Sequence, residues 1–346
     1  MVSPTLTSRS TFSAAALSLA TLSLACAPPP PKPVEAPVEV PRDLAAEARA
    51  RENAPVPELD LGPEDLTRNA GTPELSLAGE LVRQRHFHAA AEVAEKAIVK
   101  LGVTAPIDVR LAAYTLAARA RREAGDRRTA GDHRAAAETL WKQAPGAIKV
   151  ILGEGGSDEK VKERLARAIL AEAETLYFSG EELRLYAESH HRPEYAGKPW
   201  RAEVNHHLKV EIPAWIETRE KRMADAEAEY ARIGALPKVP RGWLVAADER
   251  AGAMWIHYHA ELATPPVPEP LRGKGVIPNI DGTRFEELRK VYEDRLAELR
   301  APKLGLALDR YKKCSEDAGR LAVETEEALT CAKVLRDYAG APGPKP

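Results

Sequence analysis

The sequence predicts an all-α fold, and three observations support that prediction. Alanine is abundant, whereas aromatic residues make up only 5% of the 346 residues. Small side chains let helices approach closely, while sheets favour β-branched and aromatic side chains. Apolar residues also recur at intervals of three and four along most of the chain. The clearest case is residues 77–97, LAGELVRQRHFHAAAEVAEKA, which we expect to form two short helices folded into a hairpin.

Small and large apolar residues alternate on the facing sides of this hairpin. Its apolar positions are Leu77, Ala78, Leu81, Phe87, Ala90, Ala94 and Ala97. An alanine lets two helix axes approach, while larger side chains fill the flanks of the contact. The pattern resembles the tetratricopeptide repeat, whose hairpins stack into a solenoid. The resemblance implies a scaffold that binds other proteins through a helical groove.

A degenerate copy of the hairpin follows forty residues later. The alanines that match positions of the first copy are Ala117, Ala118, Ala130 and Ala137. Arg121 and Arg127 stand where the first copy has Leu81 and Phe87, so the second unit depends more on its neighbours. We expect tetratricopeptide-like hairpins over 73–152 and a divergent helical repeat region over 153–340.

Arginines gather around the turn of the second hairpin. They are Arg119, Arg121, Arg122, Arg127, Arg128 and Arg134. One interpretation is a basic patch that binds an acidic protein or anionic envelope polymers. The other is a solvated helix face without a binding role. The net charge of the whole chain is −2, which indicates no bias toward nucleic acid.

The N-terminus has the features of an export signal. Arg9 precedes an apolar run over 12–25 that is too short and too rich in serine and threonine to predict a membrane span. The run ends in LSLAC, with the cysteine at position 26. This motif resembles the lipobox of bacterial lipoproteins, although Ser23 stands where leucine is usual.

The lipobox resemblance implies that residues 1–25 are removed and that Cys26 is lipidated. Several acyl chains on one cysteine would anchor the protein stably, and this lipid would be its only contact with the membrane. Ala27 follows the cysteine, which is similar to lipoproteins held on the periplasmic side of the outer membrane. The alternative is ordinary cleavage after Ala25, which leaves a free thiol.

Residues 26–72 are predicted to be a disordered, proline-rich tether. The run PPPPKP at 28–33 cannot form a helix or a central strand and favours polyproline II. A short exposed helix is expected within it at 43–52. Such a tether would let the folded region search a volume for its partner. As an alternative, proline-rich segments are ligands for aromatic grooves.

Longer helices are predicted downstream of the hairpins. The expected elements are a flexible loop at 152–157, a helix at 161–178, an irregular segment at 179–200, a helix at 212–233, a helix at 243–262, and three helices at 285–299, 304–314 and 321–338. Pro302 separates the first two of these last three helices. Residues 341–346 are expected to be a disordered tail.

A second resemblance covers about residues 160–338. The residues that determine it are Trp243, Arg250, Gly252, Trp255 and the loop Pro266-Val267-Pro268. Their order is similar to that in a group of tetratricopeptide-repeat envelope proteins of gliding bacteria. The resemblance implies a role in motility or in envelope assembly.

Two cysteines are predicted to meet across the last hairpin. Cys314 and Cys331 are seventeen residues apart, as are Leu77 and Ala94, whose positions would touch in the first hairpin. A disulfide is favoured in an oxidising compartment and would stabilise the fold by about 3 kcal/mol. The alternative is two buried free cysteines that pack as small apolar side chains.

Catalytic and metal motifs are missing from the sequence. It contains no nucleophile elbow, Walker motif, HExxH or CxxC, so we predict no catalytic residue, metal ligand or cofactor. The alternative function is a periplasmic metal-binding protein or enzyme that uses His190, His191, His206 and His207. Adjacent histidines on a helix point in different directions, whereas metal pairs need spacings of three or four. The leading prediction is therefore a non-enzymatic lipoprotein scaffold.

Overall fold

The computed structural model describes residues 44–59, 61, 65–68, 70–263, 267–278 and 282–338. Within these ranges all regular elements are helical, apart from one isolated antiparallel bridge between Val276 and Arg284. The all-α prediction is confirmed. The predicted signal peptide, Cys26, and the tail at 341–346 lie outside the described residues. Among the residues that are described, no helix has the length and apolarity to cross a bilayer.

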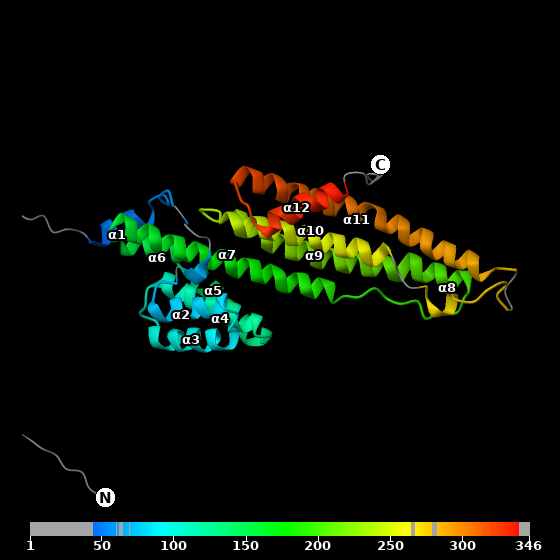
Figure 1. Ribbon diagram of the computed structural model, residues 1–346, viewed down its shortest axis with the longest axis horizontal. Helices are drawn as coiled ribbons and strands as arrows, with labels where there is room; N and C mark the ends of the chain where they lie inside the picture. The colour runs from blue at the N-terminus through cyan, green and yellow to red at the C-terminus, as the bar shows by residue number, and fades with distance from the viewer. Residues whose placement is uncertain are drawn as a thin grey trace, which may run out of the picture. The chain divides into compact units, whose positions relative to one another are not determined.

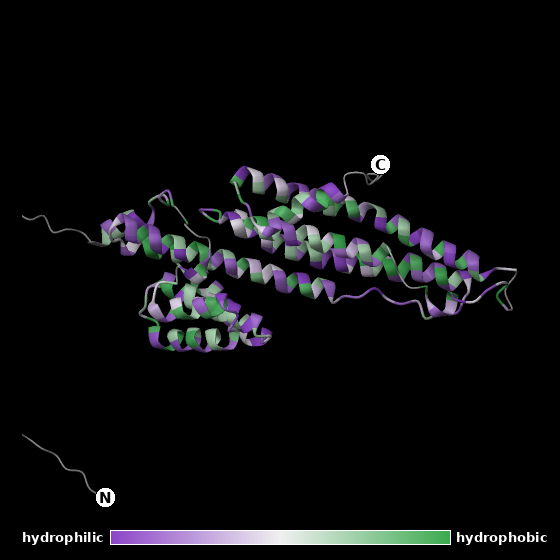
Figure 2. Ribbon diagram, in the orientation of Figure 1, coloured by the Kyte–Doolittle hydropathy of each residue, from purple (hydrophilic) through white to green (hydrophobic). Residues whose placement is uncertain are grey.

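The helices follow one another along the chain, with a longer connection between α7 and α8 (Figure 1). In chain order they are α1 (Leu44–Glu52), the 3-10 turn η1 (Leu66–Arg68), α2 (Pro73–Arg83), α3 (Phe87–Leu101), α4 (Ile107–Glu123), α5 (Arg127–Lys142), α6 (Ala147–Glu154), α7 (Asp158–Glu188), α8 (Arg201–His206), the π-helical turn η2 (His207–Glu211), α9 (Ile212–Gly234), α10 (Arg241–Ala263), the 3-10 turn η3 (Glu269–Leu271), α11 (Phe285–Leu321) and α12 (Glu326–Asp337). Polar and apolar residues alternate along the long helices, as amphipathic helices require (Figure 2).

The folded region begins earlier than predicted. Helix α1 packs on α6, and Leu59, Leu61, Leu66 and Ala70 are at most 7% exposed. These four side chains join the apolar core formed around α4 and α7. Helix α1 agrees with the short exposed helix predicted at 43–52, but the prediction of a disordered tether is wrong for the described residues of 53–72. The segment between α1 and α2 packs on the core through single apolar side chains at irregular spacings. Its sequence therefore shows no helical periodicity.

The two N-terminal hairpins share one turn geometry. The His86 amide donates to the Leu81 carbonyl at 2.8 Å, and forty residues later the Asp126 amide donates to the Arg121 carbonyl at 2.9 Å. In both turns the residue before the donor has a positive φ, 63° in the first and 88° in the second. The predicted recurrence of the hairpin is therefore present in the backbone. Membership of the tetratricopeptide-repeat family stays a prediction.

The apolar stripe of the first hairpin differs from the prediction at one position. Ala78, Ala90 and Ala94 are fully buried, as expected, but Leu77 is 52% exposed. Leu75, which is fully buried, takes its place because α2 begins at Pro73 and turns that side chain inward. The prediction for Leu77 was therefore wrong.

Helix α7 connects the two parts of the helical body. Its N-terminal half, Asp158–Leu176, packs on α4 and α5 and also reaches α9 through Glu172, and its C-terminal half, Tyr177–Glu188, packs on α9 and α10. The prediction of an irregular segment was wrong for 179–188, which is helical. Gly180 sits at this point because a Cβ there would lie 2.4 Å from the Tyr230 ring. This glycine thus marks a close contact between α7 and α9.

In the C-terminal part of the chain, α10 packs side by side with α9 and with α11. Helix α9 buries Met223, Ala226 and Ile233 along the predicted strip, while α10 buries its predicted face between α9 and α11. Helix α11 continues through Pro302, so the predicted break at this residue was wrong. Buried residues before and after the proline pack on α10, and this burial outweighs the local cost of proline. Helix α6 likewise extends to Glu154, into the predicted loop.

Candidate functional site

The predicted cysteine pair is confirmed. The Sγ atoms of Cys314 and Cys331 are 2.10 Å apart, which is a disulfide distance, and both residues are fully buried. The pair joins α11 to α12 and packs beside Val245 of α10. It fixes the last helix on the helical body and takes no part in a surface site.

The predicted arginine cluster does not form a single basic patch. Four of the six arginines are paired with carboxylates: Arg119 with Asp65 at 3.6 Å, Arg121 with Glu95 at 2.7 Å, Arg122 with Glu181 at 3.3 Å and Arg134 with Glu182 at 2.9 Å. Arg127 and Arg128 are exposed and have no side-chain partner among the described residues. The arginines mainly hold α4 and α5 to α3 and α7. Their charges are therefore largely neutralised within the chain.

The four histidines of the alternative prediction do not assemble a metal site. His207 is 1% exposed and its Nδ1 lies 2.7 Å from a Glu211 oxygen, while burial lowers the pKa of His190. The backbone carbonyl of His190, rather than its ring, accepts hydrogen bonds from Trp215 and Arg219. Within the described ranges no group of three or more His, Cys, Asp or Glu side chains is suited to a metal ion. The geometry provides no donor set for that alternative.

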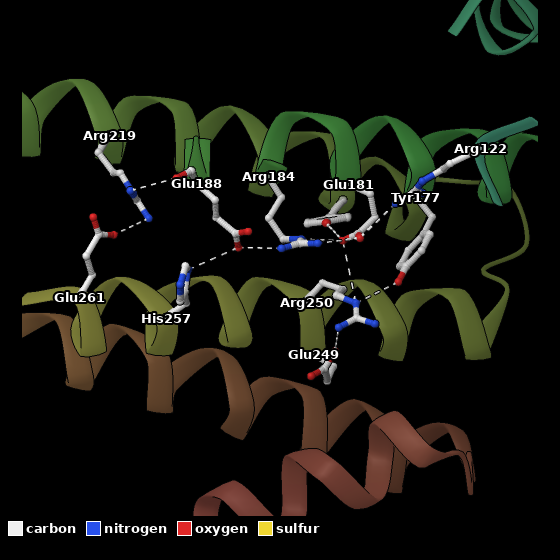
Figure 3. Close-up of polar contacts among 11 residues, drawn as sticks. Arg122, Tyr177, Glu181, Arg184, Glu188, Arg219, Glu249, Arg250, His257 and Glu261 are labelled. Carbon is white, nitrogen blue, oxygen red and sulfur yellow. Dashed lines mark hydrogen bonds and ion pairs between the residues drawn. The ribbon is translucent and has the colours of Figure 1, made fainter. Parts of the chain in front are cut away.

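A charged network runs between α7, α9 and α10 and is centred on Glu181 (Figure 3). Glu181 is 5% exposed, yet it accepts a hydrogen bond from the Tyr230 hydroxyl at 2.6 Å and from Arg184 Nε at 2.9 Å. Arg122 reaches it from α4, and Arg250 lies 3.9 Å away on α10. Burial alone would raise the pKa of Glu181, but the hydrogen bonds from Arg184 and Tyr230 outweigh burial and hold that pKa below its ordinary value.

The network continues along the same helices toward the end of α7. Glu188 accepts from Arg184 Nη1 at 2.6 Å and lies 3.9 Å from the His257 ring on α10. Arg219 of α9 is 1% exposed and pairs with Glu261 at 2.9 Å (Figure 3). Most of these side chains pair with one another, so the network mainly fixes the helices, while one oxygen of Glu249 and the Nε of Arg219 have no hydrogen-bond partner among the described residues.

An open groove lies on another face, between α9, α10 and α11. Its volume is about 680 Å³. The α9 wall consists of Ala224, Ala228, Ala231 and Gly234, which are all exposed and follow one helical face. We call these four residues the small-residue wall. Side chains of this size leave room for another helix to approach closely.

Charged residues of α11 form the opposite wall. Arg310 binds Glu227 through two hydrogen bonds of 2.8 and 2.9 Å, and Lys313 bridges Asp248 and Asp317 at 2.6 and 3.0 Å. The side chains of Arg310 and Lys313 are still 39% and 51% exposed. Burial raises the pKa of Asp248 to about 6, against the effect of Lys313. The groove is therefore lined by accessible cations above a partly buried carboxyl group.

Sequence reasoning missed this groove. The signal was present, because Ala224, Ala228 and Ala231 follow one face of a helix whose opposite face holds the buried strip. The three helices that form the groove are brought together only by tertiary packing. The sequence of a single helix does not show whether a face of small residues is covered by another helix.

The comparisons with known proteins add no relative. No protein-family model, curated protein or solved structure matches the chain. The resemblances to lipoproteins and to tetratricopeptide-repeat proteins of gliding bacteria therefore stay predictions.

Proposed function

We propose that this protein is a non-enzymatic, exported lipoprotein, anchored at the periplasmic side of the outer membrane, that binds a protein partner through its helical surface. The observation that supports the proposal most is the groove between α9, α10 and α11. It is open and is bounded by residues of three helices. The cysteine pair at disulfide distance is consistent with an oxidising compartment.

The occupant that we propose for the groove is a helix of the partner protein with acidic side chains along one edge. The small-residue wall would receive the backbone of such a helix closely. The acidic edge would face Arg310, Lys313 and Arg320 of α11, whose side chains are 39%, 51% and 63% exposed although carboxylates of the chain pair with them. On the resemblance to envelope proteins of gliding bacteria, the process we propose is motility or envelope assembly.

The face that a tetratricopeptide hairpin would use is already covered here. Thr115 on α4 contacts the Thr175 hydroxyl at 3.1 Å and the Ala171 carbonyl at 3.4 Å, both on α7. Because α7 occupies this side of α4, the proposal locates partner binding at the C-terminal groove instead.

Site-specific photocrosslinking in native envelopes tests the binding proposal. A photoreactive residue at Ala228 should give a discrete crosslinked product, while the same residue at Lys96, which is 79% exposed on α3, should not. Ala231→Arg should remove the product by filling the groove, and Arg320→Glu should weaken it by reversing a charge. Equal crosslinking at both positions, or a product that survives Ala231→Arg, would contradict the proposal.

Fatty-acid labelling tests the anchor separately. Wild-type protein should incorporate an alkyne-labelled fatty acid and stay with washed membranes, whereas Cys26→Ser should lose both properties. Unlabelled wild-type protein would overturn the lipoprotein proposal without affecting the groove.

A further inference from the structure

Two carboxyl groups in the N-terminal half of α7 are buried without adequate partners. Glu172 is 1% exposed and Glu174 is fully buried. One oxygen of Glu172 and both oxygens of Glu174 have no hydrogen-bond partner among the described residues. The nearest cationic nitrogens are those of Arg232, 3.9 Å from Glu172, and Arg119, 3.6 Å from Glu174. These distances allow ion pairing but exceed an ordinary hydrogen bond.

The surroundings of Glu172 hold as many negative as positive groups. Arg232 and Glu229 face it from α9, and Glu138 and Lys142 face it from α5. Desolvation is the dominant effect, and it raises the pKa of Glu172 to about 8 because Arg232 compensates only in part.

Glu174 has a similar environment on another side of the same helix. It faces Arg119 from α4 and Asp65 from the segment before η1. Burial raises its pKa to about 7, and Arg119 again offsets only part of that effect. Both carboxyl groups are thus stable inside the protein mainly in their neutral form.

Glu172 faces α5 and α9, whereas Glu174 faces α4. The protonation of these two carboxyl groups therefore bears on the contacts of α7 with several helices. We propose that the N-terminal half of α7 is a proton-dependent clasp, which holds α4, α5 and α9 firmly while Glu172 and Glu174 are protonated and loosens when they ionise. The inference does not depend on the proposed binding function.

The direction of the pH effect follows from proton binding. In an opened state, both carboxyl groups regain an ordinary pKa near 4.5, so the closed state binds more protons. The closed state is therefore favoured at low pH and loses stability as pH rises from about 5 to about 8. Within that window each group changes the opening equilibrium by up to about tenfold per pH unit.

Hydrogen–deuterium exchange on the full-length protein tests the clasp. Protection factors for residues 164–176, corrected for intrinsic exchange rates, should fall by at least about tenfold between pH 6 and pH 8. The double variant Glu172→Gln/Glu174→Gln should change less than about twofold, because glutamine imitates the neutral carboxyl group. The matched control Glu159→Gln, on the same helix but 87% exposed, should behave as wild type.

Carbon-13 NMR of labelled glutamate carboxyl groups gives a second measurement on the wild type that needs no folded variant. Two resonances, assigned by their couplings through the side chain to the backbone, should titrate above pH 6. Titration of both groups near pH 4.5 would overturn the proposal. So would unchanged wild-type protection at the two pH values, or an equal fall in the double variant.

Discussion

Glu174 and Glu181 lie on one face of α7, seven residues apart, and are 0% and 5% exposed. The pKa values of these two carboxyl groups are nevertheless shifted in opposite directions. Both oxygens of Glu174 lack hydrogen-bond partners, and burial raises its pKa to about 7. Glu181 accepts hydrogen bonds from Tyr230 and Arg184, and its pKa is lowered. Burial alone therefore does not decide the charge of a carboxyl group, because donors from neighbouring helices can outweigh desolvation.

The comparison also separates the contacts made by the two halves of one helix. The N-terminal half of α7 is tied to α4 by the fully buried Asp108, which pairs with Arg164 and Arg167, but Glu172 and Glu174 of the same half lack hydrogen-bond partners. The C-terminal half is held to α9 and α10 by charged side chains that satisfy one another. We therefore expect the two halves to respond differently to substitution, salt and pH.

The largest effect is expected from Glu181→Ala in the C-terminal half. The substitution removes the buried carboxylate that Arg184 and Arg122 share, and it should lower the free energy of unfolding by about 3 kcal/mol or more. Urea denaturation monitored by circular dichroism measures this change. Glu182→Ala, at an adjacent and more exposed position, should cost less than about 1 kcal/mol. A similar loss of stability in both variants would contradict the prediction that the buried Glu181 contributes more than the more exposed Glu182.

A smaller effect is expected from Gly180→Ala, which tests the close packing of the same half. The added methyl group would meet the Tyr230 ring at 2.4 Å and should lower the free energy of unfolding by about 2 kcal/mol. Gly131→Ala in α5 is the matched control, because nothing lies within 4 Å of its added Cβ. There alanine should stabilise the helix by up to about 1 kcal/mol. Thermal unfolding compares the two, and a stabilised Gly180→Ala variant would contradict the predicted contact.

The smallest effect is expected from Thr115→Val, which removes the neutral hydrogen bonds to α7 in its N-terminal half. Valine keeps the volume, so the loss should be about 1 kcal/mol. It should also be the same at low and high salt, because no charge is involved, whereas the cost of Glu182→Ala, whose side chain is 32% exposed, should depend on salt. Urea titrations at two salt concentrations measure both. A salt-dependent loss for Thr115→Val would show that the substitution also disturbs a charged contact.

Local patterns predicted much of the fold but little of the candidate site. The hairpin alanines and the strip on α9 were found because helical period and burial coincide at residues such as Ala90, Ala94 and Met223. The predictions failed where long-range packing outweighed local preference. Pro302 lies inside α11, and Gly180 is a contact point rather than a break. The groove required three helices from separate parts of the chain, which no local pattern describes.

The sequence by itself determined the helical class, the recurring hairpin and the pairing of Cys314 with Cys331. Each of these depends on residue types at short, regular spacings. Tertiary structure alone decided that α7 covers α4, that Glu174 is buried without a donor and that Glu181 is surrounded by donors. A carboxyl group acquires its pKa and its role from the side chains that packing brings to it, and glutamates on one helix face look alike until their neighbours are known.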